Sequence, residues 1–353
     1  MIIRENIPLA PLTTLGVGGP ARYFVEVGDE REVGEAVEFA RACQLPLFVL
    51  GGGSNVLVAD AGFPGLVVKV GMSDVQRLPA VQGRMSFTVA AGADWDTFVW
   101  LTVESECAGL ECLSGIPGTV GGTPVQNVGA YGQEVAETIR KVRVLDLQSL
   151  EICDLTHAEC GFSYRSSIFN GSAAGRYIIL RVSFALQLPG RANIAYPDLH
   201  TYFAKRVSLP TVAEVRTAVR EIRHSKGMLL VPGDGECHSA GSFFKNPVVS
   251  HDCFTTLAAL AEQRGDYLTG YPAAHGCRKL PAAWLVEQAG FSKGYARGAA
   301  AISGRHALAI VNRGGATAAD ILALAREIQA GVKREFGIEL QPEPVFVGFE
   351  PQC

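Results

Sequence analysis

The spacing of hydrophobic residues along the chain alternates between a helical and an extended pattern. Val33, Val37 and Ala40 recur at helical spacing and predict a helix over residues 31–45, with a buried strand at 46–50 directly after it. Runs rich in β-branched and aromatic residues predict further strands at 56–58, 65–70, 86–90, 141–145, 151–153 and 177–184. This part of the chain is therefore expected to be α+β with a large share of strand.

Three further helices carry start or stop signals. Asp94 is placed to cap one helix, and Thr211 with Glu214 forms a capping box at the start of another. Thr317 is expected to cap a long helix that Gly337 ends. Apolar spacing also predicts helices at 254–265 and 282–290 and a strand at 308–312.

Two glycine-rich turns lie among these elements. The stretch from Ser114 to Gly132 carries six glycines and two prolines without one charged side chain, and a shorter turn occupies Gly51–Gly53. Clustered glycine suits a ligand that touches main-chain N–H groups, so we expect a phosphate-bearing cofactor, with a tight loop that only packs as the alternative. Neither turn matches a dinucleotide fingerprint or a P-loop, so loop amides would hold the phosphate.

Composition narrows the class of partner. The 353 residues carry a formal net charge of −4 and no run of Lys or Arg, which argues against nucleic acid or an anionic membrane and favours a small molecule. The nine cysteines contain no C-x-x-C and the seven histidines show no metal spacing, so we expect reduced, buried thiols and no metal site. The first residues are charged where a signal peptide would be apolar, and a cytoplasmic protein is expected.

Three polar side chains lie in settings that suit chemistry. Arg165 lies among aromatic residues, where an unpaired guanidinium is costly to bury, so it needs a protein carboxylate or an anionic ligand. Ser242 follows a glycine and precedes two phenylalanines, which suits either a hydroxyl in a narrow cleft or a hydrogen-bonded core serine. Glu343 lies between two prolines that fix the backbone, so its carboxylate is either positioned for function or part of a turn.

Seven short blocks, taken in order, resemble the UDP-N-acetylenolpyruvoylglucosamine reductase family. They are Thr14–Gly16, Gly51–Val58, Gly115–Gly122, Gln126–Gly132, Tyr164–Arg165, Ala240–Pro247 and Pro342–Glu343. The resemblance implies an α+β chain with a PCMH-type (vanillyl-alcohol-oxidase-like) fold that binds FAD non-covalently. It also implies the family's reaction, in which NADPH reduces the flavin and flavin N5 passes hydride to an enolpyruvyl ether, so that UDP-N-acetylmuramate is made for peptidoglycan.

The resemblance also assigns domains. A break at Leu209–Pro210 predicts a boundary, so residues 1–208 are expected to form the FAD-binding region, in two subdomains that divide near residue 70. Residues 209–340 are expected to form the substrate-binding domain, and residues 341–353 a C-terminal strand or tail with a catalytic glutamate. We expect a monomer whose partners are NADPH and the UDP-sugar.

Site residues carry over by motif. Ser242 resembles the general acid, and Arg165 and Glu343 resemble the pair that stabilises the enol-like intermediate, where preorganised donors lower the barrier. Because Gln341 and Pro344 depart from the usual flanking residues, Glu339 remains a rival for the carboxylate role. The residues that resemble the cofactor site are Gly51, Gly52, Gly53, Ser54, Asn55, Gly115, Ile116, Pro117, Gly118, Gly121, Gly122, Gln126, Asn127, Gly129 and Ala130. Those that resemble the substrate site are Tyr164, Tyr196, Lys226, Asn246 and His306, and Tyr196 indicates the longer subtype with a tyrosine loop.

Two other classes stay open at this point. A flavoprotein oxidase of the wider PCMH-type superfamily would share the first half, although Ser54 lies where such enzymes often carry a histidine for covalent flavin attachment. A non-enzymatic sugar-nucleotide-binding protein would share the second half without flavin. An absorption spectrum before and after acid precipitation separates the three.

Overall fold

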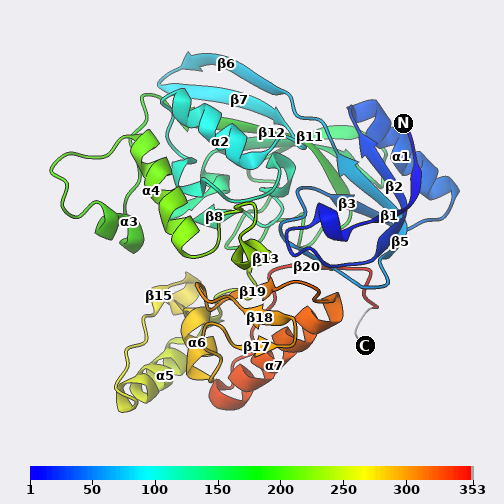
Figure 1. Cartoon of the computed structure of the whole chain (residues 1–353). Coiled ribbons are helices and arrows are strands. Elements are labelled where there is room, and N and C mark those ends of the chain that lie inside the picture. Colours follow the sequence, from blue (N-terminus) through cyan, green and yellow to red (C-terminus); the bar gives the residue numbers. More distant parts are fainter. Residues whose placement is uncertain (351–353) are drawn as a thin grey trace. The chain divides into compact units, whose positions relative to one another are not determined.

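The computed structural model describes residues 1–350, and their contacts divide the chain into two compact units. The first unit comprises Met1–Pro8, Pro20–Gly53 and Phe63–Leu230, and the second comprises Leu9–Gly19, Ser54–Gly62 and residues 231–350. Figure 1 shows the elements of both units. Each unit is thus assembled from segments that are far apart in the sequence.

The first sheet of the first unit contains four strands from the N-terminal part of the chain, and one helix packs against it. Its order is β1-β2-β5-β3, with β1 (Arg4–Pro8), β2 (Pro20–Val27), β5 (Phe63–Val70) and β3 (Leu47–Leu50). Helix α1 (Glu30–Ala42) contacts β2 and β5 and buries Val33, Ala36, Val37 and Ala40, which confirms the predicted helical stripe. The helix ends at Ala42, three residues before the predicted end.

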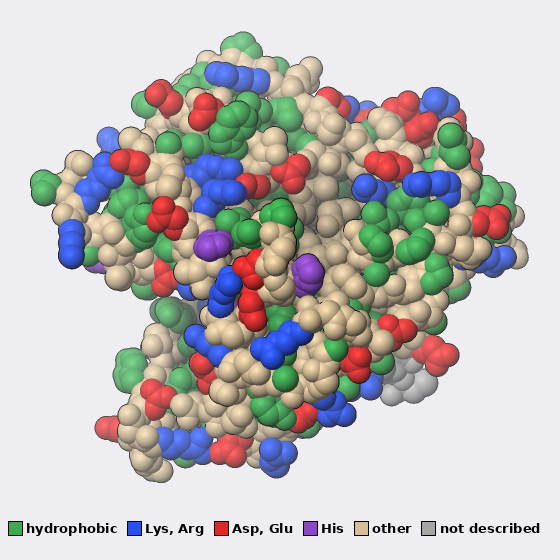
Figure 2. Space-filling model, viewed as in Figure 1, with side chains coloured by type: hydrophobic (Ala, Val, Ile, Leu, Met, Phe, Trp, Pro, Cys, Tyr) green, Lys and Arg blue, Asp and Glu red, His purple; other side chains and the backbone are tan. Residues whose placement is uncertain are grey.

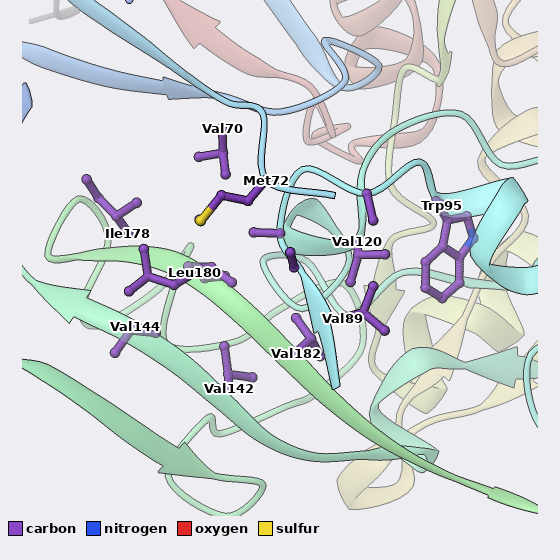
Figure 3. Packing of buried hydrophobic residues seen from close by; sticks show 14 of the residues in the cluster. Val70, Met72, Val89, Trp95, Val120, Val142, Val144, Ile178, Leu180 and Val182 are labelled. Atoms are coloured by element: carbon purple, nitrogen blue, oxygen red, sulfur yellow. The ribbon is translucent and has the colours of Figure 1, made fainter. Parts of the chain in front are cut away.

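The second sheet of the first unit is antiparallel throughout. Its order is β11-β10-β12-β7-β6, with β11 (Ile152–Thr156), β10 (Ile139–Asp146), β12 (Tyr177–Gln187), β7 (Arg84–Ala90) and β6 (Val75–Val81). Figure 3 shows its core, in which Val89, Val142 and Val182 belong to the same buried cluster as Val120 and Trp95. Trp95 begins α2 (Trp95–Glu104), whose cap Asp94 accepts the N–H of Thr97 at 2.8 Å, as predicted. The predicted division near residue 70 falls between the two sheets, and the subdomain division itself stays a prediction.

Helix α4 (Val212–Ser225) lies in the first unit, although the expected boundary at residue 209 would assign it to the substrate domain. The reason is packing: Val215, Ala218 and Val219 are buried with Cys112 and with Leu199 of α3 (Pro197–Tyr202). The predicted capping box at its start is present, because the Thr211 and Glu214 side chains each bind the other's backbone N–H. The sequence therefore predicted the cap of α4 correctly but assigned the helix to the wrong unit.

The second unit is a smaller α+β body. Its four-stranded sheet has the order β13-β19-β18-β17, with β13 (Ser239–Ser242), β19 (Ala309–Asn312), β18 (Ala300–Ile302) and β17 (Ala296–Arg297). A second, three-stranded sheet contains β14 (Val248–Val249), β16 (Arg278–Lys279) and β15 (Tyr271–Pro272). The helices are α5 (His251–Gln263), α6 (Ala282–Gln288) and α7 (Ala318–Phe336). Thr317 caps α7 and Gly337 ends it at φ +67°, both as predicted.

The early segments of the second unit are part of its core. Leu15, Val17 and Leu57 are buried among residues of the later part of the chain. Strand β4 (Val56–Val58) pairs in parallel with β20 (Val345–Val347) and so joins the chain after the short glycine-rich turn to the C-terminal segment. This pairing positions Asn55 next to Glu343, as described below.

Charged side chains of the described chain form no single-sign patch on the face seen in Figure 2, and its thiols form no disulfide bonds. On the face seen in Figure 2, basic and acidic side chains are interspersed. Within residues 1–350 no helix is long and apolar enough to cross a membrane, and no group of three or more metal-binding side chains is assembled. The eight cysteines of the described chain are free thiols, and four of them are buried. Burial was wrongly expected for Cys43 and Cys153, which are exposed, and Cys253 and Cys277 are only half-buried.

Candidate functional site

The two glycine-rich turns lie against each other in the first unit. A Cβ built on Gly52 would lie 2.5 Å from the Cα of Gly118, and one on Gly51 would lie 2.9 Å from Oγ1 of Thr119. Glycine is needed at position 52 because the backbone of the other turn fills the space of a side chain. We call residues 114–122 the glycine loop. The structure thus joins two turns that the sequence predicted separately.

The predicted cofactor residues after the glycine loop are held by a buried asparagine. Asn127 is 1% exposed; its Nδ2 donates to Glu134 at 2.8 Å and to the Ser163 carbonyl at 3.1 Å, while its Oδ1 accepts the N–H of Ala136 at 3.1 Å. The side chain is therefore used within the protein, and the backbone N–H of Asn127 donates to the Pro124 carbonyl at 3.4 Å. Gly129–Ala130 form β8, which pairs with β9 (Gln133–Glu134).

Arg165 lies beside this same segment of the first unit. Its Nη2 donates to the carbonyl oxygen of Gly129 at 2.7 Å, and its guanidinium carbon lies 5.4 Å from the ring centroid of Tyr164. The backbone at Arg165 is left-handed with φ +52°, and Asn170 Nδ2 donates to its carbonyl at 3.2 Å. A non-glycine residue with this φ is uncommon and costs energy, so the surrounding contacts hold the backbone in this conformation.

Tyr196 and Lys226 meet at a second tyrosine in the first unit. The rings of Tyr196 and Tyr131 lie edge to face with centroids 5.5 Å apart, and Lys226 Nζ lies 5.8 Å from the Tyr131 ring centroid. Lys226 Nζ also forms an ion pair with Asp198 at 2.5 Å. Burial raises the pKa of Tyr131 to about 12, so its phenol stays neutral at physiological pH.

Ser242 and Glu343 are brought together in the second unit. Ser242 ends β13 opposite Ala309 of β19, and the next residue, Phe243, accepts the N–H of Glu343 at 2.8 Å through its carbonyl oxygen. Lys245 donates its N–H to the Gln341 carbonyl at 2.9 Å, so the two segments run antiparallel past each other. The side chains of Ser242 and Glu343 are half-buried.

The support beneath these two residues is rigid. Phe243 and Phe244 are 0% and 2% exposed, and the Phe243 ring lies 5.4 Å from that of Phe244 and 6.5 Å from that of Phe346. Asn55 holds the other side, since its Nδ2 donates to the Glu343 carbonyl at 3.3 Å and its own carbonyl accepts the N–H of Val345 at 2.9 Å. A residue predicted for the cofactor thus anchors the backbone of a predicted catalytic residue.

Two predicted substrate residues of the second unit have side chains that contact the backbone. Asn246 Oδ1 accepts the N–H of Ala282 at 2.8 Å and so supports the start of α6. His306 Nδ1 accepts the N–H of Leu308 at 3.1 Å, which leaves Nε2 as the ring nitrogen that can carry the proton. Orientation is therefore set for both side chains before any ligand binds.

Comparisons with known proteins cover up to 98% of the chain. A model described as UDP-N-acetylenolpyruvoylglucosamine reductase, C-terminal domain, matches residues 233–347, and a model described as FAD binding domain matches residues 21–153. The UDP-N-acetylenolpyruvoylglucosamine reductases of Thermobifida fusca and Nocardia farcinica are 46% and 48% identical; the matches span 98% of this chain and 98% and 90% of those proteins. The crystal structure of the reductase from Thermus caldophilus aligns with a TM-score of 0.66 and 27% identity over 98% of this chain and 100% of that one.

The chain belongs to the UDP-N-acetylenolpyruvoylglucosamine reductase family. This membership confirms the resemblance, the α+β class and the PCMH-type FAD-binding fold. It also decides between the three classes that the sequence left open, because the relatives match over nearly their full length.

The glycine loop of this reductase fits FAD, the cofactor that the matched domain binds. Within residues 1–350, no hydrogen bond uses the N–H groups of Gly118 and Thr119. A Cβ built on Gly122 would meet no atom within 4 Å, although Gly122 follows the buried Val120. Backbone donors beside open space, in a loop with no acidic side chain, suit the diphosphate of FAD.

The sequence-based reasoning missed three residues around this loop. Asp96 and Arg223 bind the main chain of Gly115, and Tyr131 joins Tyr196 to Lys226. Tyr131 lies inside a motif of the family and could have been noticed there. The partners of Asp96 and Arg223 are set by tertiary packing, and no local pattern indicates them.

Proposed function

We propose that this chain uses NADPH to reduce UDP-N-acetylenolpyruvoylglucosamine to UDP-N-acetylmuramate, with Ser242, Arg165 and Glu343 as its catalytic residues. Family membership over the full chain supports the reaction. The observation that carries the roles of Ser242 and Glu343 is the hydrogen bond from the Glu343 N–H to the Phe243 carbonyl, which holds Glu343 beside Ser242. The residues of the two glycine-rich turns would hold FAD, which would supply the hydride chemistry between NADPH and the enolpyruvyl double bond. The protein's side chains then manage the proton and the negative charge.

Ser242 donates the proton in this proposal. The double bond gains hydride on one carbon and a proton on the carbon next to the carboxylate, and the Ser242 hydroxyl supplies that proton. Its alkoxide is then reprotonated from solvent. The half-buried position beside Phe243 and Phe244 supports this role, because an apolar wall limits competition from bulk water.

Arg165 and Glu343 stabilise the enol-like intermediate. Hydride addition moves negative charge onto the substrate carboxylate, and a guanidinium held in place by Gly129 and Tyr164 offers a preorganised donor. Glu343 is favoured over its rival Glu339, because the Glu339 side chain is 67% exposed and its carboxylate lies 3.8 Å from Lys333 Nζ, whereas Glu343 is half-buried and bonds the residue after Ser242.

In this proposal the substrate is bound by Tyr164, Tyr196, Lys226, Asn246 and His306. Lys226 provides a cation for the diphosphate of the UDP-sugar. The amide of Asn246 and the imidazole of His306, both oriented by hydrogen bonds to the backbone, provide polar contacts to the substrate. We further propose that the protein acts as a monomer in the cytoplasm. Static light scattering of the FAD-loaded protein at several concentrations tests the monomer directly.

The proposed function is tested on the purified protein. It should show flavin absorbance that acid precipitation releases into the supernatant. Without oxygen it should oxidise about one NADPH per flavin on its own and continue to oxidise NADPH only when the enolpyruvyl UDP-sugar is added. Flavin that stays with the precipitate, or continued NADPH oxidation at the same rate with and without the UDP-sugar, would contradict the proposal.

A further inference from the structure

The backbone of Gly115, at the start of the glycine loop, is held on both sides by charged side chains. Its N–H donates to Asp96 Oδ1 at 2.6 Å, and its carbonyl oxygen accepts from Arg223 Nε at 3.1 Å. Gly115 is in the left-handed region at φ +71°, and a Cβ there would lie 2.8 Å from Leu229. The left-handed φ and the two hydrogen bonds therefore hold the Gly115 peptide in one orientation.

Asp96 is in turn fixed by one face of α4. Arg216 donates to both of its oxygens, at 2.6 Å and 3.0 Å, and Arg220 binds Oδ2. Spacings of four and then three residues put Arg216, Arg220 and Arg223 on the same face of the helix. Burial raises the pKa of Asp96, but the hydrogen bonds from Arg216 and Gly115 and the charges of Arg216 and Arg220 outweigh burial, so the net pKa is lowered.

The residues just before Asp96 bind the rest of the glycine loop. The N–H of Trp95 donates to the Gly118 carbonyl at 3.1 Å, and Trp95 Nε1 donates to the Leu113 carbonyl at 3.0 Å. The N–H of Val120 donates to the Ala93 carbonyl at 2.9 Å. Residues 91–96 thus run alongside the glycine loop and form hydrogen bonds with it. Within this segment, the side chain of Asp96 accepts a backbone N–H of the loop.

We propose that Asp96 is a positioning residue for FAD binding, which orients the Gly115 peptide so that the loop amides face the diphosphate before FAD arrives. A loop ordered in advance loses less conformational entropy on binding, so preorganisation appears as affinity. The proposal rests on the FAD site of the family, and it is independent of the roles proposed for Ser242, Arg165 and Glu343.

Two substitutions separate the position of the acceptor from its charge. Asp96→Glu keeps the charge that the arginines need but moves the carboxylate oxygen away from the Gly115 N–H. Asp96→Asn keeps an oxygen acceptor in place but removes the charge. Loss of a hydrogen bond to a charged group should weaken FAD binding by about tenfold in Asp96→Glu. Asp96→Asn should change it by no more than about threefold, because a neutral acceptor still orients the peptide.

Asp146 offers a matched control in the same unit. It also accepts a backbone N–H, from Gln148 at 2.8 Å, and pairs with an arginine, Arg176 at 2.6 Å. It lies on β10, and in the described part of the chain no hydrogen bond joins it to the glycine loop. Asp146→Glu and Asp146→Asn should change stability without changing FAD affinity.

The test titrates FAD into the FAD-stripped full-length proteins and follows quenching of flavin fluorescence, with thermal melting of the same stripped proteins. The proposal expects weak binding in Asp96→Glu alone. It is overturned if Asp96→Glu binds FAD as the unaltered protein does, if Asp96→Asn is the weaker binder of the two, or if Asp146→Glu loses as much affinity. Failure of the unaltered protein to bind FAD would instead contradict the proposed function, so the two failures are distinguishable.

Discussion

The backbone N–H of Glu343 donates to the carbonyl oxygen of Phe243 at 2.8 Å, so a residue near the C-terminus lies next to the residue that follows Ser242. The prolines on either side of Glu343 have no N–H and restrict φ, and this bond uses the donor that remains between them. The buried pair Phe243 and Phe244 supports both segments. Any role of Ser242 and Glu343 in one reaction depends on this shared support.

Gly122 gives the cleanest glycine test of the FAD site. Gly122→Ala should fold normally and lose FAD on gel filtration, because its Cβ meets no protein atom and would project into the open space where we propose that FAD binds. Gly34→Ala, another open glycine of the first unit with ordinary φ, is the control and should keep its flavin. Gly121 is less informative, since a Cβ there would lie 2.5 Å from that of Ala91 with or without FAD. Flavin retained by Gly122→Ala would show that this part of the loop does not contact the cofactor.

Arg165→Lys should slow reoxidation of the reduced flavin by the enolpyruvyl substrate by about 100-fold, because an ammonium cannot reproduce a planar multi-donor contact. Flavin reduction by NADPH should be almost unchanged. Arg181→Lys is the control. Arg181 lies on β12 of the second sheet and pairs with Asp74, so this substitution should affect neither step. Near-normal reoxidation in Arg165→Lys would remove Arg165 from the proposed mechanism.

Asp198 is expected to compete with the substrate for Lys226. It pairs with Lys226 Nζ at 2.5 Å, so Asp198→Asn should free the lysine and lower KM for the UDP-sugar by about two- to fivefold, as expected for a partly exposed ion pair. Asp154→Asn breaks a similar pair with Lys141, at 2.6 Å, and should leave KM unchanged. A higher KM in Asp198→Asn would mean that the aspartate assists substrate binding.

Glu214 should make the stability of α4 depend on acid. Hydrogen bonds from Arg206 and from the Thr211 N–H and hydroxyl lower the pKa of Glu214 from 4.5 to about 2. The stabilisation is therefore complete above pH 4.5 and is lost as the pH falls toward 2. Urea unfolding should show Glu214→Gln less stable than the unaltered protein at pH 6, with the gap shrinking at pH 3.5. A gap of the same size at both pH values would assign the effect to the cap geometry alone.

Sequence reasoning succeeded where the determinant is local. The caps at Asp94, Thr211 and Thr317 bind residues three positions away, so a short window contains both partners. Strand β6 was not predicted, because it is an edge strand with every residue exposed and has no alternation to read. The contribution of residues 9–19 and 54–62 to the second unit is long-range and has no local signature.

The candidate site divides in the same way. The glycine-rich turns were readable from composition, but their mutual contact at Gly52 and Gly118 was not. The roles of Ser242 and Glu343 came from the resemblance to the family. The two residues are far apart in the sequence, and no sequence pattern shows that their segments lie side by side in the fold. Arg216, Arg220 and Arg223 have a readable helical spacing, but their partners Asp96 and Gly115 come from packing.

The central claim, that Ser242 is the proton donor, is tested most directly by stopped-flow absorbance of the flavin in Ser242→Ala. General acid catalysis typically contributes about 10²–10⁴-fold, so reoxidation by the enolpyruvyl substrate should slow by at least the lower figure. Reduction by NADPH should proceed at almost the normal rate, because no substrate proton is transferred in that step. Equal slowing of both half-reactions would show that Ser242 supports the flavin site instead, and slowing of neither would show that another group or water donates the proton.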